Sequence, residues 1–128
     1  NLKTPLEQAH GVMLEVQETL MRLGTPGTTA KDLYQAALDI VEKAGLSRGF
    51  MGMPQGVPFV GHGIGLELDE WPVIGKGAET ILEKGMVIAL EPKMVFPGEG
   101  VVGIENTVLV TEKGLEKINR FPDGIRVC

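Results

Sequence analysis

The chain has 128 residues, a hydrophobic content of 43% and a formal net charge of -5, which fits one globular domain and excludes a disordered chain. It has no basic block suited to a large nucleic-acid footprint and no apolar run near the roughly 20 residues that span a bilayer. The single cysteine, Cys128, excludes an internal disulfide and a Cys-rich zinc finger, and it fits a cytoplasmic location.

Two amphipathic helices are predicted at the start of the chain. The first has the N-cap, first-turn proline and capping-box glutamate of a helix start in the Thr-Pro-Leu-Glu segment at 4–7. Apolar residues then recur at steps of three and four up to Leu23, before Gly24 ends the helix. The second is predicted from Thr29 to Gly45. Its buried stripe is predicted to be Ala30, Leu33, Ala37, Ile40, Val41 and Ala44. The short connection between the helices predicts an antiparallel pair.

The second half of the chain is rich in glycine and proline and is predicted to hold short strands. A loop at 46–58 is followed by strands at 59–60, 66–71, 86–90, 94–96, 101–102, 104–111 and 115–118. The segment 73–84 is predicted to be irregular, with one helical turn from Glu79. Helices followed by strands predict an α+β fold, with two N-terminal helices packed on a curved, mostly antiparallel sheet.

Three acidic or imidazole side chains, His62, Glu91 and Glu105, each lie within two residues of glycine or proline. One imidazole and two carboxylates are a ligand set of the kind that divalent metals take, provided that the three segments converge. Each residue also has a plainer interpretation. His62 is then a structural or surface histidine, Glu91 a salt bridge at a strand end, and Glu105 a cross-strand ion pair. A phosphate loop around His62 is disfavoured, since no Lys-Ser/Thr follows it.

The remaining polar candidates are weaker. Asp69 and Glu70 precede Trp71 and, by strand alternation, Asp69 points the same way as Glu67. These carboxylates are open to a plain interpretation as solvent-facing charges, which is favoured for Glu67. His10 lies off the apolar stripe of the first helix, and it is predicted to be solvated.

Four motifs in order carry a family resemblance. They are Gly-His-Gly-Ile-Gly at 61–65, Asp-Glu-Trp-Pro at 69–72, Gly-Met-Val-Ile-Ala-Leu-Glu-Pro at 85–92 and Gly-Ile-Glu-Asn-Thr-Val-Leu-Val-Thr-Glu at 103–112. They resemble the pita-bread metallopeptidase superfamily, which includes Xaa-Pro dipeptidase (prolidase), aminopeptidase P, methionine aminopeptidase and creatinase. The four motifs are most similar to those of the Xaa-Pro group, and the resemblance covers essentially the whole chain. It implies half of a pita-bread fold.

The resemblance also implies a metal site. The family holds two divalent ions, of Mn, Co, Zn or Fe, with two aspartates, one histidine and two glutamates. By motif match, His62 is the implied histidine ligand, Glu91 a ligand and catalytic proton shuttle, and Glu105 the bridging glutamate. Two such cations share a hydroxide and polarise the scissile carbonyl, and a neighbouring glutamate passes a proton to the leaving amine.

Three departures from the family pattern matter. The two family aspartates lie upstream of the region that corresponds to Asn1. The first residues contain no secretory signal, and Asn1 is not a methionine. Residues 1–128 are therefore expected to be the C-terminal portion of a catalytic domain. Asp69 stands where the family usually has a second histidine that hydrogen-bonds substrate. A carboxylate cannot donate as an imidazole does, so this second catalytic position puts activity in doubt. Gly103 replaces an arginine that is frequent in Xaa-Pro members.

These features predict a peptidase that cleaves next to proline, acts on peptides and binds neither nucleic acid nor membrane. The isolated chain is expected to be inactive and to form a homodimer through sheet surface that the missing part would cover. Two alternatives stay open. One is a non-catalytic peptide- or protein-binding domain of the same fold, and the other is a non-peptidase hydrolase or lyase of the creatinase kind.

Overall fold

The structure, a computed structural model, describes residues 4–126. In this range two helices precede seven strands. They are α1 (Thr4–Leu23), α2 (Ala30–Lys43), β1 (Phe59–Gly63), β2 (Glu70–Gly75), β3 (Val87–Leu90), β4 (Lys93–Phe96), β5 (Gly100–Gly103), β6 (Asn106–Thr111) and β7 (Gly114–Lys117). The sequence start at 1–3 and Cys128 lie outside the described residues.

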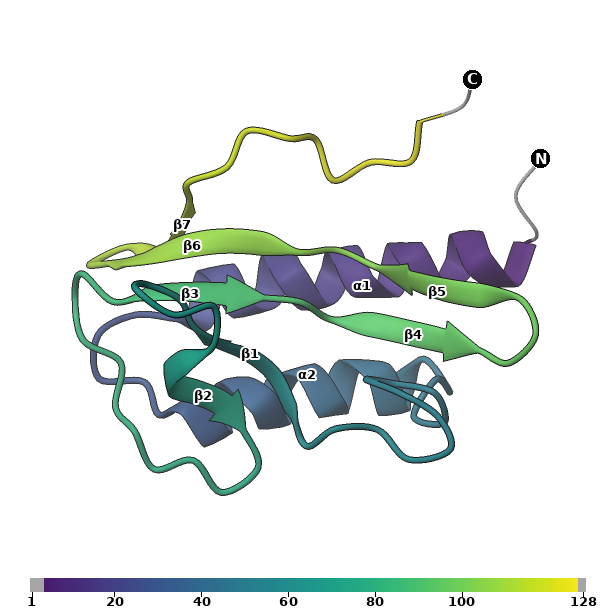
Figure 1. The fold of residues 1–128 in the computed structure, drawn as a ribbon, viewed down its shortest axis with the longest axis horizontal. Coiled ribbons are helices and arrows are strands. Elements are labelled where there is room, and N and C mark those ends of the chain that lie inside the picture. The colour runs from purple at the N-terminus through teal and green to yellow at the C-terminus, as the bar shows by residue number, and fades with distance from the viewer. Residues whose placement is uncertain (1–3, 127–128) are drawn as a thin grey trace.

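Both predicted helices form, and they lie side by side in opposite directions (Figure 1). The Thr29 side chain caps α2 by accepting a hydrogen bond from the Asp32 amide at 3.3 Å. Gly45, which follows the helix, has a φ of 72° that favours glycine. Ala44 departs from the prediction, because it is exposed just beyond the last turn. Among residues 4–126, no helix has the length and apolarity needed to cross a membrane.

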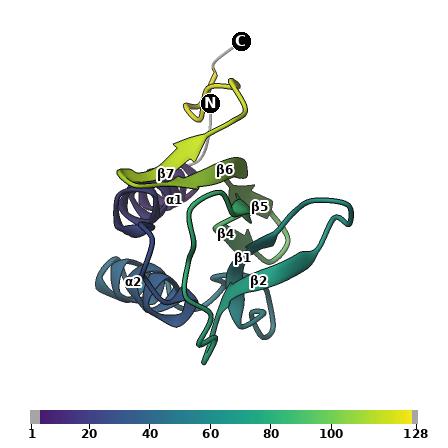
Figure 2. The same cartoon turned by 90° about the vertical axis from the view of Figure 1, so that its left-hand side faces the viewer.

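The strands form one antiparallel sheet in the order β2-β1-β3-β6-β7 and a separate two-stranded ladder of β4 and β5. The helices cover one face of these strands, and the opposite face, turned to the viewer in Figure 1, carries no helix among the described residues (Figures 1 and 2). The core lies between the two layers, where Leu20, Ile88 and Val108 are fully buried. The predicted α+β fold is confirmed.

The segment after β1 differs from the prediction. Residues 64–69 form an irregular loop, and β2 begins only at Glu70. The apolar residues Leu66 and Leu68 are exposed, so their alternation with charged neighbours does not reflect a buried strand face. The strand predicted at 66–71 is therefore wrong over most of its length.

The helical turn predicted from Glu79 is also wrong. The segment around it runs beside the α1–α2 connection, and its carbonyls accept hydrogen bonds from that connection. The Gly27 amide donates to the Leu82 carbonyl at 2.9 Å, and the Ala30 amide donates to the Thr80 carbonyl at 2.8 Å. Pairing with the start of α2 therefore replaces the local helical bonds.

Candidate metal site

His62 is held rigidly in the middle of the sheet. It lies in β1, opposite Val73 of β2 and Ala89 of β3. The neighbouring glycines allow this close packing, because a Cβ on Gly61 would lie 2.6 Å from the Ala89 carbonyl oxygen and a Cβ on Gly63 would overlap the Trp71 carbonyl. The His62 side chain is 9% exposed. The glycine spacing noticed in the sequence thus serves strand packing.

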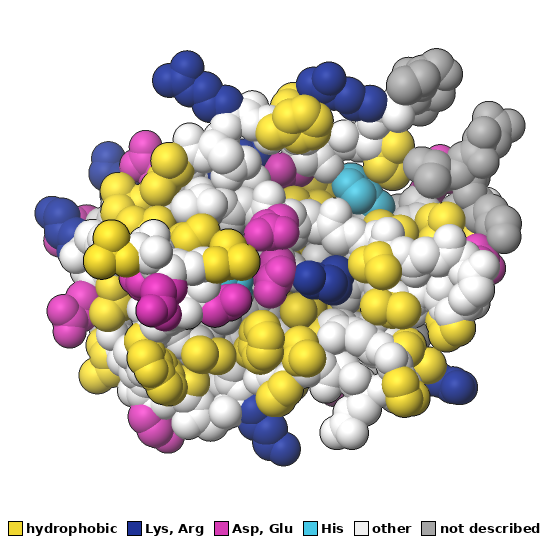
Figure 3. All heavy atoms as spheres, viewed as in Figure 1, with side chains coloured by type: hydrophobic (Ala, Val, Ile, Leu, Met, Phe, Trp, Pro, Cys, Tyr) yellow, Lys and Arg dark blue, Asp and Glu magenta, His cyan; other side chains and the backbone are white. Residues whose placement is uncertain are grey.

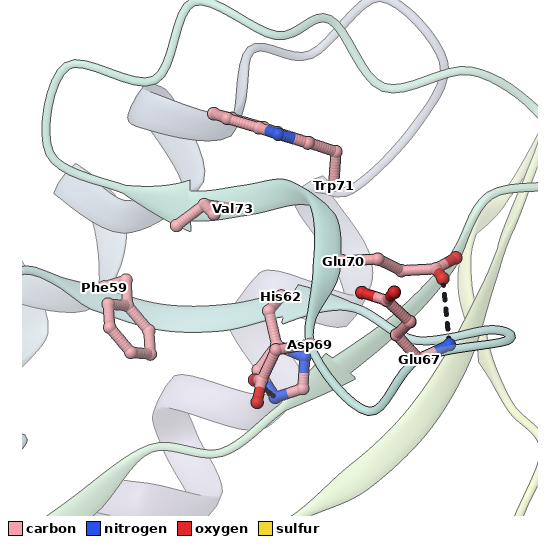
Figure 4. A pocket seen from close by; sticks show the side chains of 7 residues that line it. All are labelled: Phe59, His62, Glu67, Asp69, Glu70, Trp71 and Val73. Carbon is pink, nitrogen blue, oxygen red and sulfur yellow. Dashed lines mark hydrogen bonds and ion pairs between the residues drawn. The ribbon is translucent and has the colours of Figure 1, made fainter.

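The ring nitrogens of His62 have different surroundings. Nδ1 lies 2.8 Å from the Gly63 carbonyl oxygen, which can only accept, so Nδ1 carries the proton and donates. Nε2 faces two carboxylates, with Asp69 Oδ1 at 3.1 Å and Glu91 Oε1 at 3.8 Å. Figure 4 shows the His62 and Asp69 side chains pointing toward each other. A nitrogen lone pair and two carboxylates repel one another, so this arrangement favours a cation at Nε2.

Both the backbone and the side chain of Glu91 have a polar partner. It directly follows β3, and its amide donates to the Val60 carbonyl at 2.9 Å. Its side chain is 17% exposed, and Oε2 lies 2.9 Å from Lys93 Nζ. The ion pair at a strand end, which was one interpretation of this residue, is therefore present. The second carboxylate oxygen remains turned toward His62.

Glu105 lies outside a strand, contrary to the prediction. β5 ends at Gly103 and β6 begins at Asn106, so Glu105 occupies a two-residue break and is exposed. The predicted cross-strand ion pair is absent among residues 4–126. Glu105 and Glu91 line the same depression, which has a volume of about 180 Å³.

The three predicted ligands share one face of the sheet. Cα partners His62, Ala89 and Thr107 form one row across β1, β3 and β6. Glu91 and Glu105 lie two residues beyond Ala89 and Thr107. Glu91 Oε1 lies 3.8 Å from His62 Nε2, and Glu105 lines the same depression as Glu91. Figure 3 shows acidic side chains gathered near the middle of this helix-free face, with a basic side chain beside them.

These residues form a partial donor set for a metal. Within residues 4–126, no three His, Cys, Asp or Glu side chains are grouped closely enough to hold an ion. The His62 and Glu91 side chains are neighbours, and Glu105 and Glu91 line the same depression. The donor types fit a divalent cation, and closing the site requires further ligands.

Asp69 belongs to a larger depression beside the same histidine. This depression has a volume of about 580 Å³ and is lined by Phe59, His62, Glu67, Asp69, Glu70, Trp71 and Val73 (Figure 4). Asp69 and Glu67 are exposed, as expected for Glu67, but Asp69 also pairs with His62. It therefore provides an anionic acceptor next to the imidazole.

Sequence reasoning missed two residues and misplaced a third. Gln17 is 1% exposed, and it lies on the buried stripe of α1 between Val16 and Leu20. A polar residue at such a position is the signal that predicts a buried hydrogen-bonding role. Lys93 was not singled out either. His10 is half-buried rather than solvated, with Nε2 2.9 Å from the Asp123 carbonyl oxygen.

Comparisons with known proteins agree on one family. The profile of Metallopeptidase family M24 matches residues 2–112. The chain is 38% identical over 113 residues to a Xaa-Pro dipeptidase of Pyrococcus furiosus, covering 88% of this chain and 31% of that protein. It is 36% identical over 120 residues to a probable dipeptidase, PepE, of Mycobacterium tuberculosis, covering 94% of this chain and 30% of that protein.

A solved structure with the same fold is the X-Pro aminopeptidase from Thermotoga maritima MSB8. The TM-score is 0.87 at 28% identity, and the match covers 98% of this chain and 33% of that one. The chain thus spans about a third of the length of the relatives that it matches.

Proposed function

The chain belongs to Metallopeptidase family M24, and from that premise we propose that it is the C-terminal portion of the catalytic domain of a longer Xaa-Pro peptidase. Its fold is that of the pita-bread prolidases. The proposed reaction is hydrolysis of a peptide bond next to proline, by a dipeptidase or an aminopeptidase. Support comes from the relatives named Xaa-Pro dipeptidase and X-Pro aminopeptidase.

The observation that carries the proposal is the shared face of His62, Glu91 and Glu105, with His62 Nε2 3.8 Å from Glu91 Oε1. We assign these three side chains as metal ligands, and two divalent ions of Mn, Co, Zn or Fe as the cofactors of the longer protein. Two aspartates outside this chain would complete the site. When bound, the ions would supply an activated water and polarise the scissile carbonyl.

The side chains of this chain have separate proposed roles. Glu91 moves a proton between the attacking water and the leaving amine, because its Oε1 faces the site while Oε2 is paired with Lys93. His62 presents Nε2 to the site, since its Nδ1 donates to Gly63. Asp69 accepts hydrogen bonds from the N–H groups of a substrate, which a carboxylate can do and an imidazole does only through one nitrogen.

Activity of the longer protein tests the proposal. With Mn²⁺ or Co²⁺ it should hydrolyse Ala-Pro or the first bond of an Ala-Pro-Ala tripeptide. Glu91→Gln should lower kcat at least about a hundredfold, because general acid–base groups contribute that much. A protein that is metal-loaded and folded but cleaves neither peptide, or a Glu91→Gln variant of full activity, would refute the assignment.

A non-catalytic binding domain is the second candidate, and the Asp69–His62 pair favours it. That pair, at 3.1 Å, occupies His62 Nε2 with a side chain of the protein itself. The longer protein would then bind Xaa-Pro peptides, measured by calorimetry, without releasing products over hours.

A homodimer and a cytoplasmic location complete the proposal. Exposed apolar side chains beside the site, including Leu68 and Trp71, support association. The single cysteine of the sequence fits a reducing compartment.

A further inference from the structure

The two glutamates lie within a break in what is otherwise one continuous two-stranded ribbon, formed by β3 and β4 on one side and β5 and β6 on the other. Leu90 of β3 pairs with Asn106 of β6, and Lys93 of β4 pairs with Gly103 of β5. Two residues on each side separate these pairs, so the register continues across the break without a slip. Residues 91–92 therefore face residues 104–105, and Glu91 and Glu105 occupy corresponding positions of the opposed segments.

The backbone at this break turns to partners outside the ribbon. Pro92 has no N–H to give to the ladder, although its carbonyl still accepts from the Ile104 amide at 3.1 Å. The Glu91 amide donates to the Val60 carbonyl of β1 at 2.9 Å, which continues the β1–β3 ladder one residue past Leu90. Because Pro92 cannot donate, the opposed Ile104 carbonyl needs a donor from elsewhere, and side-chain donors can bind at this break.

Gln17 of α1 supplies those donors. Its Nε2 donates to the Leu90 carbonyl at 2.9 Å and to the Ile104 carbonyl at 3.2 Å. Both partners are carbonyls, which only accept, so they fix the orientation of the amide. The residues after these two carbonyls are the two glutamates. One buried side chain thus bridges the peptide units that lead into both carboxylates.

The peptide unit between residues 90 and 91 is consequently held from two sides. Its carbonyl receives a hydrogen bond from Gln17 of α1, and its N–H donates to Val60 of β1. Gln17 Oε1 is buried and has no hydrogen-bond partner among the described residues. An unpaired buried acceptor is unfavourable for stability, so stability alone does not account for an amide at this position.

We propose that Gln17 is a positioning residue, which fixes the spacing of the Glu91 and Glu105 carboxylates by holding the two sides of the ribbon break. This inference rests on the proposed function of both glutamates as metal ligands. The expected effect of losing the Gln17 amide is local. The two strand ends at the break are freed, while the rest of the sheet keeps its hydrogen-bond ladder.

The test compares Gln17→Met with Leu20→Ala in the 128-residue chain. Methionine keeps the length of the side chain and removes both donors. Leu20 is fully buried one turn further along α1, and none of its side-chain atoms reaches the two carbonyls by a hydrogen bond. Amide hydrogen exchange and the broadening of NMR signals by added Mn²⁺ are measured for each protein.

In Gln17→Met, exchange at the Glu91 and Ile104 amides should accelerate about tenfold more than at Val108, because two hydrogen bonds are lost at the break alone. The apparent Mn²⁺ affinity should fall about fivefold or more. Leu20→Ala should accelerate exchange throughout the sheet and leave the Mn²⁺ affinity unchanged.

Uniform acceleration in Gln17→Met, or an unchanged Mn²⁺ affinity where the parent chain binds Mn²⁺ through Glu91, would overturn the proposal. If none of the 128-residue proteins binds Mn²⁺, the same affinities are measured on the longer protein, and absence of Mn²⁺ binding there would overturn the proposed metal function. If Gln17→Met does not fold, the unmodified chain decides. Scalar couplings across hydrogen bonds should then join the Gln17 amide to the Leu90 and Ile104 carbonyls, and their absence would overturn the assignment.

Discussion

At the scale of single residues, the site owes its shape to hydrogen bonds that each side chain makes away from it. His62 turns Nε2 toward two carboxylates because Nδ1 donates to Gly63. Glu91 offers one oxygen because Lys93 pairs with the other at 2.9 Å. Lys93 therefore already supplies one positive charge to the Glu91 carboxylate, on the oxygen that is turned away from His62.

Removal of this ammonium should favour a divalent ion. In the 128-residue chain, Lys93→Met should raise the Mn²⁺ affinity about three- to tenfold, because Glu91 loses a cation that competes for its carboxylate. The matched control is Lys31→Met, which breaks the exposed Lys31–Glu79 pair and changes the net charge equally. Calorimetric titration that finds the same change for both variants would show that only net charge matters.

Residue patterns revealed part of the site. Nearby glycines and prolines predict His62, Glu91 and Glu105, and the structure has Glu91 beside His62 and Glu105 in one depression with Glu91. Gln17 and Lys93 were missed, because their importance depends on partners far away in sequence or on the path of the chain after Pro92. Helical periodicity could flag Gln17 as buried, but it could not identify the two carbonyls.

At the scale of elements, local signals predicted the helices well and the irregular strands poorly. The caps and apolar spacing of α1 and α2 are local, so they were readable from sequence. In the loop at 64–69, leucines that alternate with charged residues predict a half-buried strand. In the structure these leucines are exposed, so the prediction is wrong there. The break at Glu105 is not visible in the sequence, because β-rich residues continue through it. In the structure the ribbon resumes after the break in unchanged register.

Two glycines in different elements should respond oppositely to a methyl group. Gly61→Ala should destabilise the chain by about 3 kcal/mol, because the new Cβ meets the Ala89 carbonyl in the middle of the sheet. Gly11→Ala should stabilise it by about 1 kcal/mol, since Gly11 lies inside α1 and a Cβ there has no neighbour within 4 Å. Urea unfolding of both variants measures these changes. Equal effects would contradict the packing derived for β1.

At the scale of the whole molecule, the two layers leave one sheet face without a helix among the described residues (Figure 2). The relatives are about three times as long as this chain. Apolar side chains beside the site, such as Leu66, Leu68 and Trp71, are exposed. A surface of this kind favours association when nothing else covers it.

The chain alone should therefore dimerise at micromolar concentration, with Trp71 near the contact. Trp71 is the single tryptophan of the sequence and is 76% exposed. Its fluorescence should shift to the blue as the chain is concentrated, in step with a dimer seen by sedimentation velocity. Leu68→Asp should move both transitions to higher concentration. A monomer at all concentrations up to ~0.1 mM would exclude this interface.

The same chain should be catalytically silent. With Mn²⁺ or Co²⁺ and Ala-Pro, we expect no hydrolysis above that of the Glu91→Gln variant, because the described residues do not close a metal site. Product release measured by chromatography gives the comparison. Turnover that depends on Glu91 would mean that this chain alone assembles a working centre.

The central claim is that His62, Glu91 and Glu105 bind the same metal, and residue-resolved NMR during Mn²⁺ addition tests it most directly. The signals of these three residues should broaden first and together, and His62→Ala should remove the effect at both glutamates. Broadening confined to the exposed acidic loop around Glu67 and Glu70, with His62, Glu91 and Glu105 unaffected, would contradict it.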